Sequence, residues 1–156
     1  MSSPLRPLSV PRLAQGMSLV EVMVALLVLA VGLLGIAAMQ SLALRGSQSS
    51  LETSQAIMAT SSILEAIRAN PAQAGSYNMA KTCTTPGAGS TRVSNDQAAW
   101  IAALKSTIGG GVSDATTCGQ ITNCATTCTI TVFWDDSRAG TDVGGSGRSL
   151  SVEARI

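Results

Sequence analysis

A long apolar run near the N-terminus is the strongest pattern in the sequence. Residues 22–39 contain no charged side chain. A helix of this length measures about 27 Å at 1.5 Å per residue, close to the hydrocarbon thickness of a bilayer. Glu21 stands directly before the run, where a carboxylate needs either a partner or a place at the membrane interface. The pattern predicts a membrane-spanning helix with a functional acid at its start.

The helical pattern continues beyond residue 39, but it becomes more polar. Residues 40–69 contain no proline, and charged side chains reappear among them. Apolar residues recur there every seven positions, with a second row beside the first (Leu44, Leu51 and Met58; Ile57, Leu64 and Ile67). Such stripes predict that one face of the helix packs on a domain. Asn70-Pro71 ends the helix, because the residue before a proline avoids helical conformations.

Alternating positions in the C-terminal part predict two paired strands. Residues 128–134 and 150–156 each place apolar side chains on one face (Cys128, Ile130, Val132 and Trp134; Leu150, Val152, Ala154 and Ile156). The polar, glycine-rich residues 135–147 connect them. We expect an antiparallel hairpin laid on the long helix, and hence an α+β fold.

The middle of the chain predicts less regular structure. Residues 72–94 are rich in Gly, Ser, Thr and Pro and are expected to form a loop or an irregular strand. Ser94 or Asn95 is a candidate N-cap for a short helix that runs through Lys105, and the glycines at 109–111 end it. This glycine triplet lacks the Lys-Ser/Thr of a phosphate-binding loop and is interpreted as a linker.

Composition argues against catalysis and against nucleic-acid binding. The chain has no histidine, the commonest general base and zinc ligand, so we predict no enzyme activity and no cofactor. Its net charge is +1, and two of the ten basic residues, Arg6 and Arg12, lie among the first sixteen. Two Trp, one Tyr and one Phe offer little surface for base stacking, so no nucleic acid is expected as a partner.

Four cysteines, all beyond the apolar run, are disulfide candidates: Cys83, Cys118, Cys124 and Cys128. An even number in a small exported domain indicates up to two disulfides, and three pairings are possible. A bond at Cys124 and Cys128 would tie the loop that holds Cys118 to the sheet. Zinc is the alternative, but the paired C-x₂-C spacing is missing.

Three aspartates beside the 135–147 connection raise the question of calcium. Asp135, Asp136 and Asp142 lack the order of an EF-hand loop, and the sequence predicts a solvated turn instead of a metal site.

The residues before the apolar run form a short positive leader. Residues 1–16 contain Arg6, Arg12, three prolines and no acid, so we expect them to stay in the cytoplasm while the C-terminal part is exported. Gly16-Met17, followed by Glu21, resembles the class III signal of type IV prepilins. That resemblance implies that prepilin peptidase cleaves the Gly16–Met17 bond and N-methylates Met17. Glu21 is then the acid at the fifth mature position, which could pair with the α-amine of a neighbouring subunit in the filament.

Two longer stretches of sequence resemble a narrower class of proteins within the type IV prepilins. Residues 21–35 and 64–71 look like those of PilV-type minor pilins, and the related minor pseudopilins of type II secretion are the nearest alternative. A third possibility is an exported enzyme or ligand-binding domain on an uncleaved anchor.

The resemblance implies a pilin-like fold, with a long N-terminal helix packed on a small antiparallel sheet. Its parts would be a cytoplasmic leader, a transmembrane half-helix, an amphipathic half-helix and a globular head (residues 1–16, 17–39, 40–70 and 71–156). Gly32 and Gly35 are candidates for the stretch that melts in assembled filaments.

The implied function is that of a minor pilin in the assembly-initiation or tip complex of a type IV pilus, supporting twitching motility and adhesion. The implied partners are prepilin peptidase, and other minor pilins and the major pilin through their N-terminal helices. The protein would lie in the inner membrane before assembly, with its head in the periplasm, and in the pilus afterwards.

Overall fold

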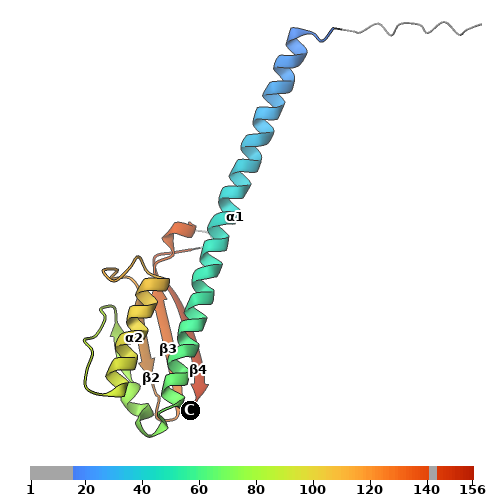
Figure 1. Ribbon diagram of the computed structural model, residues 1–156. Coiled ribbons are helices and arrows are strands. Elements are labelled where there is room, and N and C mark those ends of the chain that lie inside the picture. The colour runs from blue at the N-terminus through green and yellow to red at the C-terminus, as the bar shows by residue number, and fades with distance from the viewer. Residues whose placement is uncertain (1–15, 141–143) are drawn as a thin grey trace, which may run out of the picture. The chain divides into compact units, whose positions relative to one another are not determined.

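The computed structural model describes residues 16–140 and 144–156, so Asp142 and all of the predicted leader except Gly16 lie outside the described residues. Two compact units, residues 1–40 and 41–156, make up the chain. The predicted α+β, pilin-like architecture is confirmed: a long N-terminal helix is followed by a small antiparallel sheet (Figure 1). The elements are α1 (Leu19–Arg68), η1 (Pro71–Tyr77), β1 (Met79–Thr82), α2 (Arg92–Thr107), β2 (Cys118–Thr122), β3 (Thr127–Trp134), η2 (Ser137–Ala139) and β4 (Arg148–Arg155).

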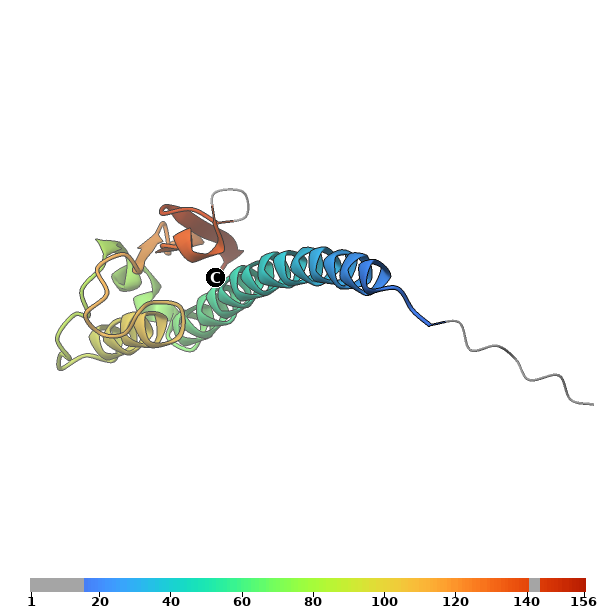
Figure 2. The same cartoon turned by 90° about the horizontal axis from the view of Figure 1, so that it is seen from above.

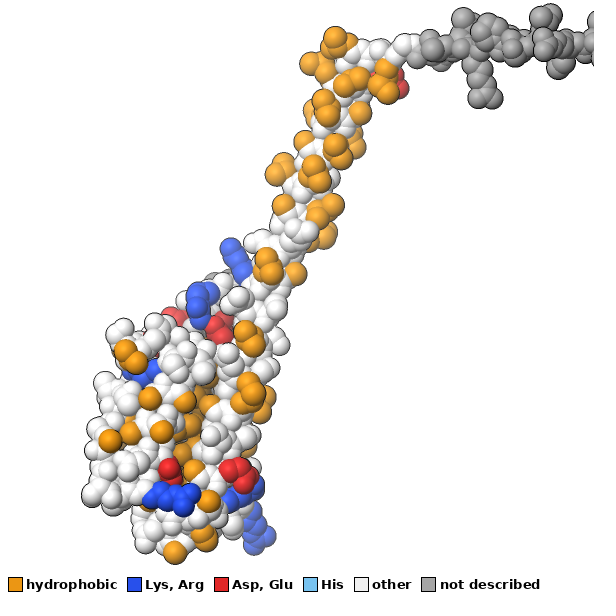
Figure 3. Space-filling view, viewed as in Figure 1, with side chains coloured by type: hydrophobic (Ala, Val, Ile, Leu, Met, Phe, Trp, Pro, Cys, Tyr) orange, Lys and Arg blue, Asp and Glu red, His pale blue; other side chains and the backbone are white. Residues whose placement is uncertain are grey.

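α1 includes the apolar run predicted at residues 22–39, and the predicted continuation over residues 40–69 is helical up to Arg68. Its N-terminal part is apolar on every side, and Figure 3 shows orange side chains along the visible length of this segment. None of the residues from 19 to 40 is buried. By length and composition alone, this helix can cross a membrane.

The sheet has the strand order β1-β2-β3-β4, and every neighbouring pair is antiparallel. The predicted hairpin is confirmed as β3 and β4, with Ile130 opposite Val152. β2 pairs with the other edge of β3, where Ile121 lies opposite Ile130. β1 and β2 contain only four and five residues, too few for alternation to distinguish them from loops.

α2 and the part of α1 that lies in the unit 41–156 cover one face of this sheet, side by side, in Figure 1 and Figure 2. Trp100 of α2 donates its indole N–H to the Ala59 carbonyl of α1 at 3.0 Å. Apolar residues of α1, α2 and the inner strand faces form a single core, which includes Ile67, Ile101 and Ile130, each fully buried.

The start of α2 differs from the prediction of Ser94 or Asn95 as N-cap. Thr91 is the N-cap, and its Oγ1 accepts the Ser94 backbone N–H at 3.2 Å. Ser94 lies three residues inside the helix and returns a hydrogen bond from its hydroxyl to the Thr91 carbonyl at 2.9 Å. Thr91 and Ser94 therefore cap the helix together, and α2 begins earlier than predicted.

The packing face of α1 also differs from the prediction. Leu44, Leu51 and Met58, the heptad row expected to pack on the domain, are 68%, 54% and 61% exposed. The buried residues of α1 are instead Ser49, Glu52, Ala56, Thr60, Ile63, Leu64 and Ile67. Of the predicted second row, Leu64 and Ile67 are buried, whereas Ile57 is 48% exposed. The buried face thus carries apolar side chains such as Ile63 and Ile67 toward the end of α1, and polar side chains such as Ser49 toward its middle.

Gly119 of β2 allows α2 to lie close to the sheet. A Cβ at this position would overlap the ring of Trp100 and Ile101 Cδ1, both from buried side chains. We expect Gly119→Ala to lower the free energy of unfolding by about 1–3 kcal/mol, because the packed core cannot admit another methyl group without strain. Urea denaturation measures the change. Gly75→Ala is the matched control, since no atom lies within 4 Å of its added Cβ; equal effects of the two variants would contradict the packing argument.

Candidate functional site

The predicted cleavage bond lies outside regular secondary structure. Gly16 and Met17 precede the first residue of α1, and both are exposed. Met17 is 74% exposed, and a Cβ added to Gly16 would meet no atom within 4 Å. A protease needs such an accessible, non-helical backbone around the bond that it cleaves. The geometry at Gly16–Met17 is therefore compatible with processing.

Glu21 lies in the first turn of α1, where Ser18 caps the helix. The Glu21 backbone N–H donates to Ser18 Oγ at 3.3 Å, and Ser18 and Glu21 have the spacing of a capping box. A carboxylate at this position is also stabilised by the positive end of the helix dipole. None of the ion pairs found between described residues involves Glu21. Sequence reasoning missed Ser18, although the Ser-x-x-Glu pattern was there to find.

Gly32 and Gly35 lie inside the continuous α1 helix. A Cβ at either position would meet no atom within 4 Å, so neither glycine is required for packing against the described residues. Each weakens the helix by about 1 kcal/mol relative to alanine. Their predicted melting concerns the assembled filament and stays a prediction.

The four cysteines, all in the described part of the chain, form two disulfides. Cys83–Cys118 joins the residue after β1 to the first residue of β2, and Cys124–Cys128 closes the turn between β2 and β3. Cys118 is the first residue of β2, whereas the sequence placed it in a loop. It is anchored by its own disulfide to Cys83, and the Cys124–Cys128 bond does not anchor it. The disulfides thus connect β1, β2 and β3 in series.

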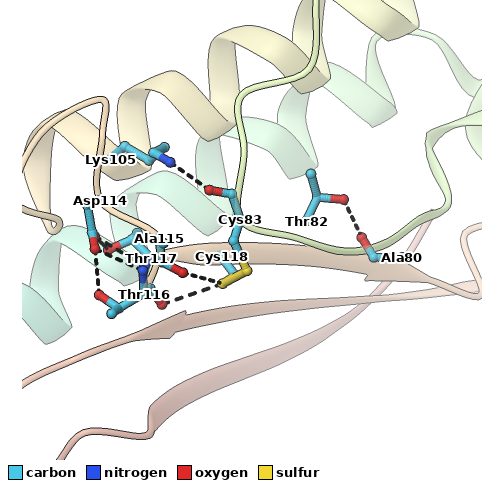
Figure 4. The surroundings of a disulfide bond; sticks show 9 residues. All are labelled: Ala80, Thr82, Cys83, Lys105, Asp114, Ala115, Thr116, Thr117 and Cys118. Atoms are coloured by element: carbon cyan, nitrogen blue, oxygen red, sulfur yellow. Dashed lines mark hydrogen bonds between the residues drawn. A yellow bond between two sulfur atoms is a disulfide. The ribbon is translucent and has the colours of Figure 1, made fainter.

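A buried lysine lies beside the first disulfide, as Figure 4 shows. Lys105 of α2 is 2% exposed, and its Nζ donates to the Cys83 carbonyl oxygen at 2.6 Å. This bond fastens the segment after β1 to α2. The contact gives the buried Lys105 side chain a structural role.

Asp114 organises the turn that leads into β2, also drawn in Figure 4. Its carboxylate accepts the backbone N–H groups of Thr116 and Thr117 at 2.8 and 3.1 Å, and both hydroxyl groups as well. Burial raises the pKa of Asp114, but the hydrogen bonds from Thr117 and Thr116 outweigh it and lower the pKa from 3.8 to about 2. The ionised form is therefore part of the folded structure.

Acid should remove this contribution. Because the folded pKa of Asp114 is depressed, its stabilisation is complete above pH 3.8 and is lost as the pH falls through about 2. We expect Asp114→Asn to reduce the loss of unfolding free energy between pH 5 and pH 2 by about 2 kcal/mol. Urea titrations at the two pH values measure it. Glu65→Gln removes an exposed carboxylate as the control; if both variants keep the full acid dependence, Asp114 is not its source.

A cluster of polar side chains, separate from the one around Asp114, joins α1 to the ends of the β3–β4 connection. We name it the polar clamp. It consists of Ser49, Glu52, Asp136, Arg138 and Arg148. Ser49 Oγ donates to Asp136 Oδ2 at 2.6 Å, and Arg148 Nη1 donates to the same two oxygen atoms at 3.1 and 3.3 Å. Arg138 forms an ion pair with Glu52. The sequence singled out only Asp136 of these five.

Asp136 does not lie in the solvated turn that the sequence predicts. It is 1% exposed, because β3 and β4 carry the connection back onto α1, where Ser49 and Arg148 satisfy the carboxylate. Burial raises the pKa of Glu52, and the Arg138 guanidinium opposes that effect only in part. Among the described residues, no group of three or more His, Cys, Asp or Glu side chains is placed to hold a metal ion.

The comparison with protein families identifies one motif. Residues 11–37 match the model of the prokaryotic N-terminal methylation motif, which includes the Gly16–Met17 bond, Glu21 and both helix glycines. No curated protein and no solved structure matches the chain. The motif supports a type IV pilin or pseudopilin with an apolar N-terminal helix that fits membrane anchoring. It indicates a structural subunit instead of an enzyme, and implies processing by prepilin peptidase and assembly with other pilins.

Proposed function

We propose that this chain, which carries the prokaryotic N-terminal methylation motif, is a PilV-type minor pilin that acts in the assembly-initiation or tip complex of a type IV pilus. It would support twitching motility and adhesion in that role. The observation that carries the proposal is the position of the motif: it covers an exposed Gly16–Met17 bond directly before an apolar helix segment that none of the described residues covers.

The proposal assigns separate roles to neighbouring residues. Prepilin peptidase reads Gly16 and removes the cytoplasmic leader, residues 1–16. Met17 becomes the methylated N-terminus. The apolar part of α1 holds the protein in the inner membrane, with the head, residues 71–156, in the periplasm, and later packs with the N-terminal helices of other minor pilins and the major pilin.

Glu21 is the assembly contact in this scheme. Cleavage creates a positive α-amine on Met17, and an apolar filament core has no water to solvate it. Pairing with the Glu21 carboxylate of an adjacent subunit offsets the cost of burying both charges. The absence of an ion pair to Glu21 among the described residues leaves its carboxylate available for this contact.

The alternative is a minor pseudopilin of a type II secretion system. It is favoured by residues 21–26, Glu-Val-Met-Val-Ala-Leu, which that class shares. A deletion strain separates the two: loss of pili with normal exoprotein secretion supports the pilin, and loss of secretion with intact pili supports the pseudopilin.

Mass spectrometry of the mature N-terminus tests the proposal itself. The expected product begins with N-methyl-Met17, and its formation requires prepilin peptidase. A strain without the peptidase is the control and should retain the leader. An intact leader in the parent strain would contradict the pilin-class reading and support an exported domain on an uncleaved anchor.

A further inference from the structure

The exposed side of α1 carries no charged residue along much of the folded unit. Between residues 46 and 64 the only charged side chain is Glu52, which is buried because it belongs to the polar clamp on the inward face. Large apolar side chains occupy the exposed side instead, each of them 48–68% exposed: Leu44, Leu51, Ile57 and Met58. Figure 3 shows such orange side chains along the lower part of α1. A helix side that faces water normally carries charged residues, so this side has the composition of an interface.

The exposed side also has a regular period. Apolar residues alternate with serines at steps of three and four positions, and the six residues of this series, which we name the seam, are Leu44, Ser47, Leu51, Ser54, Met58 and Ser61. All six are exposed. Steps of three and four make the heptad period with which one α-helix packs along another. Small residues between the large ones let a second backbone approach closely. The seam therefore fits a helix as its partner.

The serine hydroxyl groups of the seam do not depend on water. Ser54 Oγ donates to the Ser50 carbonyl oxygen at 2.9 Å, and Ser61 Oγ donates to the Ile57 carbonyl oxygen at 3.0 Å. Both bonds run back one turn within α1. Burial is costly for a polar group that has no partner, and these two hydroxyl groups already have theirs. A second helix can cover them without leaving a donor unpaired.

The sheet of the same chain lies on the opposite side of α1. Ala56, which is fully buried in the core, comes two positions after Ser54 and two before Met58. Residues two positions apart on a helix point about 200° away from each other. The seam thus faces away from the sheet, and a second α1 can approach it without meeting the core of either chain.

The membrane helix and the neighbours of the seam point to a second copy of this chain as the partner. Two copies anchored by the same residues of one continuous helix are parallel, and their equivalent positions lie at equal depth. Charges at the positions that flank a heptad seam decide which helices pair. Here none of the flanking positions is charged, so nothing repels an identical helix: Ala43, Gln48, Ser50, Gln55, Ile57 and Ser62. The next position of the repeat is Glu65, where like charges would meet, so the pairing ends before it.

We propose that two copies of this chain, anchored in the same membrane, pair through the seam as a parallel coiled coil over residues 44–61. Leu44, Leu51 and Met58 of each copy pack against the same residues of the other and leave water, which is favourable. The two sheets lie on the outer sides of the pair. This inference rests on the membrane anchoring in the proposed function, but not on the role in a pilus.

Cross-linking of the full chain in phosphatidylcholine vesicles tests the pairing. The native cysteines are all paired, so Ser54→Cys supplies the only free thiol, in the middle of the seam. A short bis-maleimide joins two free thiols and leaves disulfides intact. We expect at least about tenfold more cross-linked dimer from Ser54→Cys than from Ser149→Cys. Ser149 is the matched control, because it is exposed on β4 and its neighbour Leu150 faces the core. Equal yields, or no dimer from Ser54→Cys, would overturn the proposal.

Variants of the seam separate pairing from chance collision. Leu51→Gln with Met58→Gln, added to Ser54→Cys, replaces two exposed side chains, and circular dichroism checks that the chain stays folded. We expect the dimer yield to fall at least about tenfold, because each copy loses two apolar contacts. Val112→Gln replaces an exposed apolar residue away from the seam and should leave the yield unchanged. A yield that does not respond to the seam variant would overturn the proposal.

Carbonate extraction keeps this test distinct from the test of the proposed function. If carbonate removes the chain from the vesicles, both the membrane anchoring and the pairing are contradicted. An inserted chain that gives no dimer overturns the pairing alone. In cells, a cross-link from Ser54→Cys to a different subunit, without any dimer, would assign the seam to that subunit and would also overturn the pairing of two copies.

Discussion

Glu21→Ala is expected to leave cleavage of the Gly16–Met17 bond intact while lowering the amount of the protein in sheared filaments by about 100-fold. The peptidase reads Gly16, whereas assembly needs the carboxylate. Without it, the Met17 α-amine of a neighbour enters an apolar core unpaired. A charge in such surroundings costs about 2.5–3.5 kcal/mol, and each 1.4 kcal/mol is a factor of ten. Immunoblots of the membrane and filament fractions measure processing and incorporation separately.

The position of Glu21 in the first turn of α1 requires its own control. Its carboxylate is also stabilised by the positive end of the helix dipole, so the loss of Glu21 could act through the helix terminus instead of through a neighbour. Glu21→Gln keeps a residue that suits a capping box but removes the charge, and Ser18→Ala removes the cap but keeps the charge. Pairing predicts that the Gln variant is excluded from filaments and that the Ser18→Ala variant enters them. The opposite result would assign Glu21 to helix capping, and parental levels of Glu21→Ala in filaments would refute the pairing.

Removing the Cys83–Cys118 disulfide should destabilise the head about twice as much as removing Cys124–Cys128. The first bond spans 35 positions of sequence and the second spans four. A longer closed loop restricts the unfolded chain more strongly, which corresponds to about 4 kcal/mol for the first bond and about 2 kcal/mol for the second. The double variants Cys83→Ser with Cys118→Ser and Cys124→Ser with Cys128→Ser are compared by urea denaturation.

Each disulfide variant is the matched control for the other, because both replace the two sulfur atoms of one disulfide by two hydroxyl groups. Reducing agent should lower the stability of either variant further, since each retains one bond. If the two variants lose equal stability, loop closure does not determine the contribution of these disulfides. A larger loss for the Cys124–Cys128 variant would place the main constraint at the β2–β3 turn.

The long helix and the β3–β4 hairpin were predictable because their patterns are local and long. Eighteen uncharged residues at positions 22–39 specify a helix that tolerates lipid, and Asn70-Pro71 ends α1. In β3, the alternation from Cys128 to Trp134 matches the buried positions. Short strands such as β1 carry no comparable signal, since four residues hold two alternations at most.

The face that α1 turns to the sheet was not predictable from the heptad row. Periodicity identifies a face that could be buried, but the partners of the buried polar residues lie more than 80 positions away, as Asp136 does from Ser49. No local pattern relates those positions. The burial of Asp136 was also missed. An aspartate in a glycine-rich connection usually faces solvent, and the partners that bury this one are remote in sequence or belong to the next strand.

The sequence by itself determined the membrane-length helix, the order of leader, glycine and acid around Gly16–Met17, and the main hairpin, because each follows from neighbouring residues. Only the tertiary structure decided the disulfide pairing, the face that α1 turns to the sheet and the partners of Asp136. These depend on contacts between segments remote in sequence, such as the 2.6 Å hydrogen bond between Ser49 and Asp136, which no local pattern of residues encodes.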